Sequence, residues 1–125
     1  MPTMLDHFKN ATETKSFLAG DIVFEVGTTD PHMYAIREGE VEIYFNDVLV
    51  ETVGPGGFVG EKSLIDGQPH TTTAIAKTDV TAALVDEKKF LFLVHETPTF
   101  ALQVMRVQAQ RIRRLMQIAI GAPQT

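Results

Sequence analysis

Cysteine and tryptophan are absent from this 125-residue chain, and serine occurs only at Ser16 and Ser63. Without cysteine the chain has neither a disulfide framework nor a thiolate metal site, and neither serine lies in a Gly-x-Ser-x-Gly motif. No apolar run approaches the roughly 18 residues of a membrane-spanning helix, and the N-terminus lacks the basic start and apolar core of a secretory signal. We therefore expect a cytoplasmic protein with no membrane association, folded as one domain over residues 1–125.

The sequence also lacks the residue pairs that enzymes use. Its four histidines stand far apart, and none forms a His-x-His or His-Glu-x-x-His pair, so no metal site is predicted. Glu61 is the only acid within residues 54–65, and no second carboxylate stands at a spacing that suggests an acid and base pair. We expect neither catalysis nor a bound cofactor.

Charge is distributed unevenly along the chain. Residues 1–96 hold all 16 acids and 7 of the 11 basic residues, a net charge of −9, whereas residues 97–125 hold four arginines and no acid, a net charge of +4. The acidic body argues against nucleic-acid binding, which requires clustered cations. We expect the arginines to suit the negative end of a helix and to pair with the acidic body.

Residues 14–86 have the composition of short strands separated by turns. Val41, Ile43 and Phe45 alternate with more polar residues, which predicts a half-buried strand. Asn46-Asp47 then predicts a hairpin turn, because both residues tolerate positive φ. Around eight short antiparallel strands in this order favour a mainly β, jelly-roll-like roll.

The pattern changes after about residue 86, and helices are predicted over residues 87–120. Asp86 is a suitable cap for a short helix over Glu87–His95. Thr97-Pro98 is a second start signal, and the helix that follows is expected to run from Thr99 to about Ala119.

This last helix has two apolar faces. One face has the alternating three- and four-residue spacing of a coiled-coil seam, and the other is made of Val104, Val107, Leu115 and Ile118. The seam consists of Leu102, Met105, Ala109, Ile112, Met116 and Ala119. A helix that buries two sides packs on the barrel with one and on a partner with the other, so we predict a homodimer.

Residues 54–74 are the most informative segment. Gly54, Gly56, Gly57 and Gly60 precede the carboxylate of Glu61, and a threonine-rich strand closes the segment. Glycine lets a backbone approach a ligand closely, and successive N–H groups can form an anion-binding nest. We interpret the segment as a binding pocket for a small anionic ligand.

These residues resemble the cyclic-nucleotide-binding domains of catabolite activators and protein-kinase regulatory subunits, over roughly residues 8–119. The resemblance implies an eight-stranded β-roll flanked by a short N-terminal helix and C-terminal helices. The matching motifs are Gly20-Asp21, Met33–Ile36, Glu38–Val41, Gly54–Gly56, Phe58–Glu61, Leu64–Pro69 and Thr71–Ala74.

The resemblance also implies a ligand site for cyclic AMP or cyclic GMP. Gly60 and Glu61 fall where the family binds the ribose, and Thr71 falls where a hydroxyl and an amide contact the cyclic phosphate. His70 stands where the family usually has arginine. The predicted set of contact residues is Gly60, Glu61, Lys62, Ser63, His70, Thr71 and Thr72.

Two departures from the family pattern weaken this expectation. Arginine offers phosphate a permanently charged fork, whereas histidine is mostly neutral at pH 7 and shorter. Ile118 and Ala119 stand where some members contact the purine with polar side chains. The sequence therefore predicts a non-enzymatic sensor that binds its ligand weakly, or alternatively a dimerisation or protein-interaction module with a vestigial pocket and an unidentified protein partner.

Each predicted contact also has a purely structural interpretation. Glu61 can accept hydrogen bonds from loop amides, and His70 can face solvent. Thr71 can be an ordinary β-branched strand residue, and residues 54–60 can be a tight turn that the roll requires.

Overall fold

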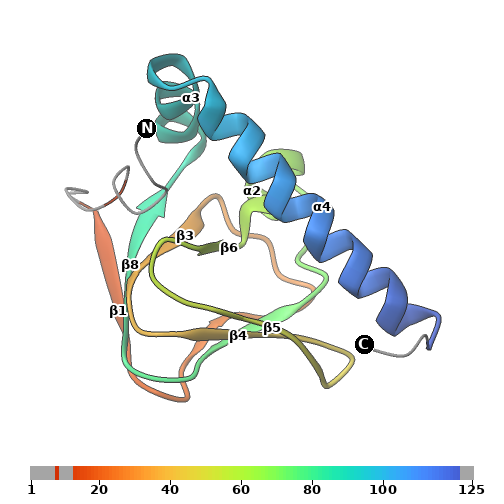
Figure 1. Ribbon diagram of the computed structural model, residues 1–125. Coiled ribbons are helices and arrows are strands. Elements are labelled where there is room, and N and C mark those ends of the chain that lie inside the picture. The colour runs from red at the N-terminus through yellow and green to blue at the C-terminus, as the bar shows by residue number, and fades with distance from the viewer. Residues whose placement is uncertain (1–7, 9–12, 122–125) are drawn as a thin grey trace.

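A computed structural model describes residue 8 and residues 13–121 of the chain. Eight strands and three helices lie in this part of the chain (Figure 1). They are β1 Thr14–Phe17, β2 Ile22–Phe24, β3 Met33–Glu38, β4 Val41–Phe45, β5 Val48–Val53, β6 Phe58–Val59, α2 Glu61–Asp66, β7 Thr73–Ala76, β8 Val80–Val85, α3 Glu87–Glu96 and α4 Thr99–Ala119.

The strands form two four-stranded antiparallel sheets. One sheet has the order β1-β8-β3-β6 and the other β2-β7-β4-β5. The chain crosses repeatedly between the sheets, which is the arrangement of a jelly-roll-like β-roll. The predicted mainly β class with eight strands and C-terminal helices is confirmed. The predicted short N-terminal helix falls on residues outside the described part, apart from Phe8, which is buried.

Two strands bury both of their faces, so they separate two apolar cores. Successive side chains of a strand point to opposite faces. In β3, Tyr34 and Ile36 join the core between the sheets, whereas Met33 and Ala35 join the core under the helices. In β8, Ala82 and Ala83 divide in the same way. This double burial fixes the register of the sheet, because a one-residue slip would exchange every side chain.

The helical region begins and ends close to the predicted positions. The carboxylate of Asp86 accepts a hydrogen bond from the amide of Lys89 at 2.8 Å, so it caps α3 as predicted. Thr97 ends α3, where its amide donates to the carbonyl of Leu93, and its own carbonyl accepts a hydrogen bond from the amide of Phe100 at 2.8 Å at the start of α4. Gly121 follows α4 with φ of 72°, a conformation that terminates helices readily.

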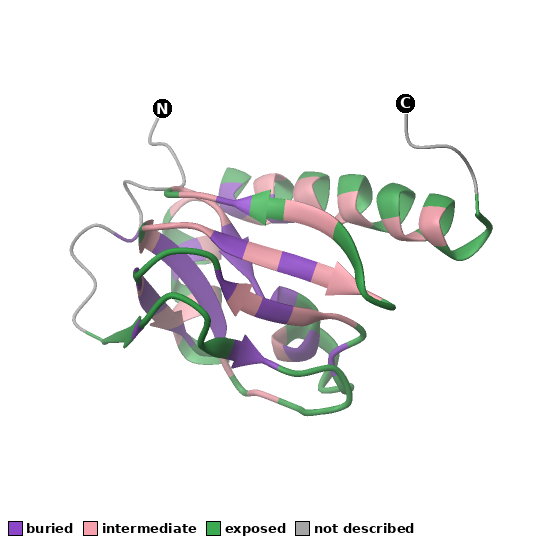
Figure 2. Cartoon of the chain, turned by 90° about the horizontal axis from the view of Figure 1, so that it is seen from below, coloured by how far each residue is buried: buried purple, intermediate pink, exposed green. Residues whose placement is uncertain are grey.

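The long helix α4 crosses one side of the roll from α3 past α2 (Figure 1). Val104 on its inner face is fully buried, whereas Met105 and Met116 on its outer face are more than half exposed. Burial is concentrated in β3, β6 and β8, whereas in α4 only Phe100 and Val104 are buried and the other residues are partly buried or exposed (Figure 2). The helix therefore packs on the roll with one face only.

Candidate functional site

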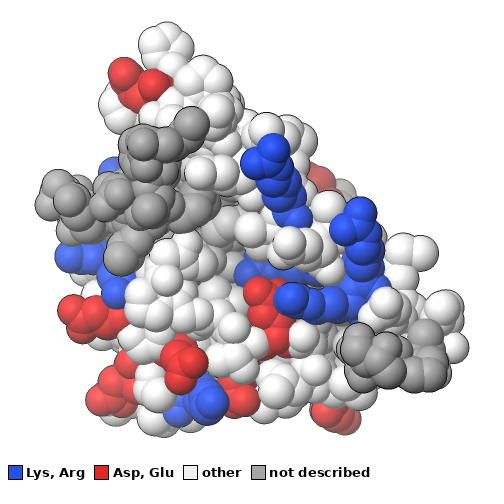
Figure 3. Space-filling view, viewed as in Figure 1, with Lys and Arg blue, Asp and Glu red and all other residues white. Residues whose placement is uncertain are grey.

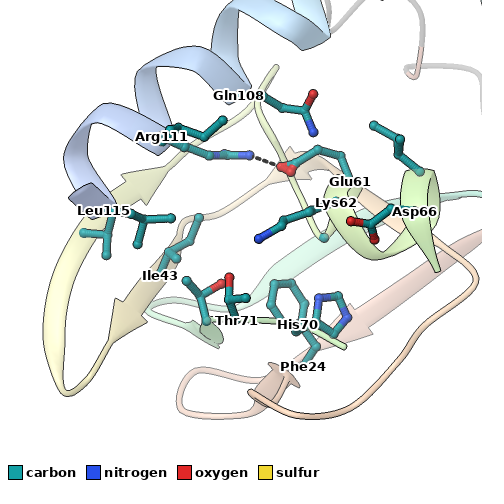
Figure 4. Close-up of a pocket in the computed structure, with 15 residues that line it drawn as sticks. Phe24, Ile43, Glu61, Lys62, Asp66, His70, Thr71, Gln108, Arg111 and Leu115 are labelled. Atoms are coloured by element: carbon teal, nitrogen blue, oxygen red, sulfur yellow. Dashed lines mark hydrogen bonds and ion pairs between the residues drawn. The ribbon is translucent and has the colours of Figure 1, made fainter. Parts of the chain in front are cut away.

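A cavity of about 320 Å³ lies between α2, the strands β4 and β5, and the inner face of α4 (Figure 4). Its volume falls at the lower end of the range for small-ligand pockets. Its walls are mainly apolar, and its polar groups come from the predicted segment and from α4. The lining residues are Phe24, Ile43, Val50, Gly60, Glu61, Lys62, Ile65, Asp66, His70, Thr71, Thr72, Gln108, Arg111, Ile112 and Leu115.

The glycines of the predicted segment have two different roles. Gly60 lines the cavity with φ of 82°, and a Cβ at this position would lie 3.3 Å from the Phe24 ring. The turn at Gly54–Gly57 instead hydrogen-bonds to β3, through the amide of Gly56 and the carbonyl of Gly57. The structural interpretation is therefore correct for the turn at residues 54–57, and only Gly60 remains a candidate contact.

Glu61 is buried, and its carboxylate binds the guanidinium of Arg111 from α4. Arg111 also donates from Nε to Glu51 Oε1 at 2.8 Å and from Nη2 to the carbonyl of Phe58. One arginine thus joins α4 to β5, β6 and α2. The prediction that the arginines pair with the acidic body is confirmed at this position and at Arg114, 3.3 Å from Glu51.

Charge in this network is balanced. Burial raises the pKa of Glu61, although the Arg111 guanidinium acts in the opposite direction. Burial acts to lower the pKa of Arg111, but the carboxylates of Glu61 and Glu51 outweigh it and raise the pKa, so Arg111 stays protonated. Two carboxylates therefore meet two guanidinium groups, those of Arg111 and Arg114. Figure 3 shows basic side chains along the C-terminal helix meeting acidic ones over the roll.

His70 lies at the opposite end of the cavity and is 95% buried, so the interpretation that it faces solvent is wrong. Its ring stacks on Phe24 with the ring centroids 3.9 Å apart. Its Nε2 is buried without a hydrogen-bond partner in the described part of the chain. Burial lowers the pKa of His70, although the carboxylate of Asp30 acts in the opposite direction. The imidazole is therefore neutral at pH 7.

The structure brings six of the seven predicted contact residues to the cavity and separates one from it. Gly60, Glu61, Lys62, His70, Thr71 and Thr72 all line the cavity. Ser63 is buried outside it, and its hydroxyl accepts a hydrogen bond from the amide of Asp30 at 3.3 Å. Ser63 therefore supports the loop before β3 and does not face this cavity.

Sequence reasoning missed Arg111 and Gln108, both of which line the cavity from α4. A signal for them was present, because Val104, Gln108, Arg111 and Leu115 follow one another at helical spacing on the inner face. Polar residues in an otherwise apolar stripe indicate a polar partner beneath the helix. Ile118 and Ala119 do not line the cavity.

Among the described residues, no three histidine, cysteine, aspartate or glutamate side chains are grouped so that they could hold a metal ion. None of the helices in that part of the chain is both long and apolar enough to span a membrane.

Comparison with known proteins gives consistent matches. The sequence model of the family described as the cyclic nucleotide-binding domain matches residues 14–97. The catabolite activator protein of Thermus thermophilus is similar to this chain with a TM-score of 0.76 and 21% identity, over 94% of this chain and 56% of that one.

Two further solved structures are similar. One is the cGMP-bound form of the EAL enzyme Bd1971, with a TM-score of 0.64 and 28% identity over 87% of this chain and 30% of that one. The other is the regulatory subunit of a cAMP-independent protein kinase A from Trypanosoma brucei, with a TM-score of 0.73 and 22% identity over 91% of this chain and 44% of that one. The chain thus spans between about a third and just over half of these three proteins.

Proposed function

Because the chain belongs to the cyclic nucleotide-binding domain family, we propose that it is a non-enzymatic sensor that binds cyclic AMP or cyclic GMP weakly in the cavity beneath α4. The observation that carries this proposal is the convergence of Gly60, Glu61 and Thr71 on one cavity of suitable volume. The family resemblance assigns the ribose to Glu61 and the cyclic phosphate to Thr71. Phe24 and Leu115 offer apolar walls for the base.

The contact between Glu61 and Arg111 is compatible with this role. Arg111 binds Glu61 through Oε1, and a carboxylate can accept about four hydrogen bonds, so a ribose hydroxyl can be added at Glu61. Because Arg111 belongs to α4, any change at Glu61 on binding reaches α4 directly. This connection supports a sensor whose signal passes to the C-terminal helix.

A thermal-shift measurement tests the proposal. A ligand that binds only the folded state raises the unfolding midpoint by mass action, so we expect millimolar cyclic AMP or cyclic GMP to raise it.

Calorimetry with His70→Arg is expected to show cyclic-nucleotide binding stronger by about tenfold to a hundredfold, which is the effect of one charge-assisted hydrogen bond. Adenosine serves as a matched probe without phosphate and is expected to gain nothing from the substitution. The absence of heat for both proteins with both cyclic nucleotides would refute the sensor function.

We further propose that two copies of the chain pair through the outer face of α4. Leu102, Met105, Ile112 and Met116 are 42–60% exposed and follow a coiled-coil spacing. Light scattering across micromolar concentrations is expected to show a dimer that Met105→Glu weakens, whereas Gln110→Glu, an equal change in charge at another exposed position of α4, does not. A wild-type monomer at every concentration would contradict the pairing.

The alternative function is a protein-interaction module with a vestigial pocket. It is favoured by the neutral, buried His70 at the position expected to bind phosphate. One solved structure with this fold is described as the regulatory subunit of a cAMP-independent protein kinase A from Trypanosoma brucei. Loss of a specific partner on mutation of the outer face of α4, with no nucleotide binding, would favour this alternative.

A further inference from the structure

Neither end of the cavity offers a free positive charge to a ligand anion. At one end Arg111 is already bound by Glu61 and Glu51, and Arg114 contacts Glu51 as well. Since the carboxylates and guanidinium groups balance, this end offers an anion no net attraction. An arginine held by two carboxylates is also restricted in position, because moving it would leave buried carboxylates unpaired.

The opposite end offers no charge either. His70 is neutral at pH 7 because burial lowers its pKa, and its ring is held against Phe24. Thr71 and Thr72 contribute only neutral hydroxyl groups. A cyclic phosphate placed against this wall therefore has hydrogen-bond donors but no cation from the wall itself.

Lys62 is the cavity-lining cation that remains. It follows Glu61 in α2, is exposed, and forms no ion pair within the described part of the chain. Figure 4 shows its side chain extending into the cavity, with the ammonium nitrogen between the Glu61–Arg111 pair and Thr71. Asp66, the other acid in the lining, accepts a hydrogen bond from the amide of Gln68 at 2.9 Å.

We propose that the ammonium group of Lys62 binds the phosphate of the ligand and replaces the arginine that the family resemblance leads one to expect at His70. This inference rests on the proposed function. Lysine acts on phosphate as a point charge, and its flexible stem lets the ammonium reach an anion without a fixed geometry. The phosphate would then lie between Lys62 and the hydroxyl of Thr71, with the ribose toward Glu61.

The test is calorimetry on the full chain with cyclic AMP and cyclic GMP as probes. Lys62→Met is expected to weaken binding by about tenfold to a hundredfold, which is the effect of one charge-assisted hydrogen bond. Lys62→Arg, which keeps the charge, is expected to bind within about threefold of the wild type. Adenosine and guanosine, which lack the phosphate, are expected to bind the wild type and Lys62→Met equally.

Lys88→Met is the matched control. Lys88 is an exposed lysine of α3 that does not line this cavity, so its substitution removes the same charge at a different place. We expect it to bind the cyclic nucleotides as the wild type does. Because Lys62 and Lys88 are both exposed, both variants are expected to unfold at the wild-type midpoint.

The outcomes separate this inference from the function on which it rests. Wild-type binding that Lys62→Met leaves unchanged would overturn the role of Lys62 and leave the sensor function standing. Equal weakening by Lys62→Met and Lys88→Met would also overturn it, because only the net charge would then matter. If the wild type binds neither cyclic nucleotide, both proposals fail together.

Discussion

The two ends of the cavity differ in how completely their buried polar groups are satisfied. At the Glu61 end, one guanidinium joins groups from β5, β6, α2 and α4. At the His70 end, a buried ring nitrogen has no partner in the described part of the chain, and the ring is held by stacking on Phe24. The difference indicates that the first end holds the helix in place, whereas the second tolerates chemical change.

Replacing Arg111 by alanine is the strongest way to test this comparison. The substitution leaves Glu61 buried without its partner and leaves Glu51 with Arg114 alone. Breaking a buried ion pair in this way costs about 3–5 kcal/mol. We expect the free energy of unfolding, measured by urea titration, to fall by about that amount.

Arg113→Ala is the control for this change. Arg113 is exposed on the same helix and makes no ion pair with a described residue. We expect it to alter the free energy of unfolding by less than about 0.5 kcal/mol. If the two alanine variants are equally stable, the Arg111 network does not hold α4 on the roll.

His70→Phe tests the other end and should have a smaller effect of the opposite sign. Phenylalanine keeps an aromatic ring against Phe24 and removes a buried nitrogen that has no partner. Leaving a buried polar group unsatisfied costs about 1–3 kcal/mol, part of which the larger ring will offset by crowding. We expect the free energy of unfolding to stay constant or to rise by about 1 kcal/mol in urea titration. A loss above about 2 kcal/mol would mean that the imidazole makes bonds that the fold needs.

Much of the fold could be predicted because its signals are local. The hairpin at Asn46-Asp47 shows the expected positive φ at both residues, 49° and 65°. The strand Val41–Phe45 and the helix Thr99–Ala119 have the predicted bounds. Each of these depends on alternation, on turn residues or on a terminating glycine, all of which are read within a few neighbouring residues.

The helix α2 and the partners within the site could not be predicted in the same way. The six-residue helix Glu61–Asp66 begins after Gly60 with no side-chain cap, so the usual start signal is missing. Arg111 meets Glu61 and Glu51 across 50 and 60 residues of sequence. The orientation of His70 depends on Phe24, in a strand 46 residues earlier. These contacts exist only after the sheets and α4 have packed.

The smallest effect expected at the His70 end is a dependence of the free energy of unfolding on pH. Burial lowers the pKa of His70 in the folded protein, so below the ordinary value of about 6.5 the unfolded chain binds a proton that the folded chain does not. The contribution of His70 to the free energy of unfolding is therefore complete above about pH 6.5. It decreases as the pH falls toward the lower, folded pKa, with a slope of at most about 1.4 kcal/mol per pH unit.

Urea titrations at pH 7.5, 6.5 and 5.5 on the wild type and His70→Phe isolate this contribution, because both proteins share the remaining histidines and Glu61, whose pKa is raised by burial. We expect the wild type to lose more stability than His70→Phe on acidification. Parallel curves would show that the imidazole is no harder to protonate in the fold than in the unfolded chain, and would remove the reason for assigning the phosphate to a different cation.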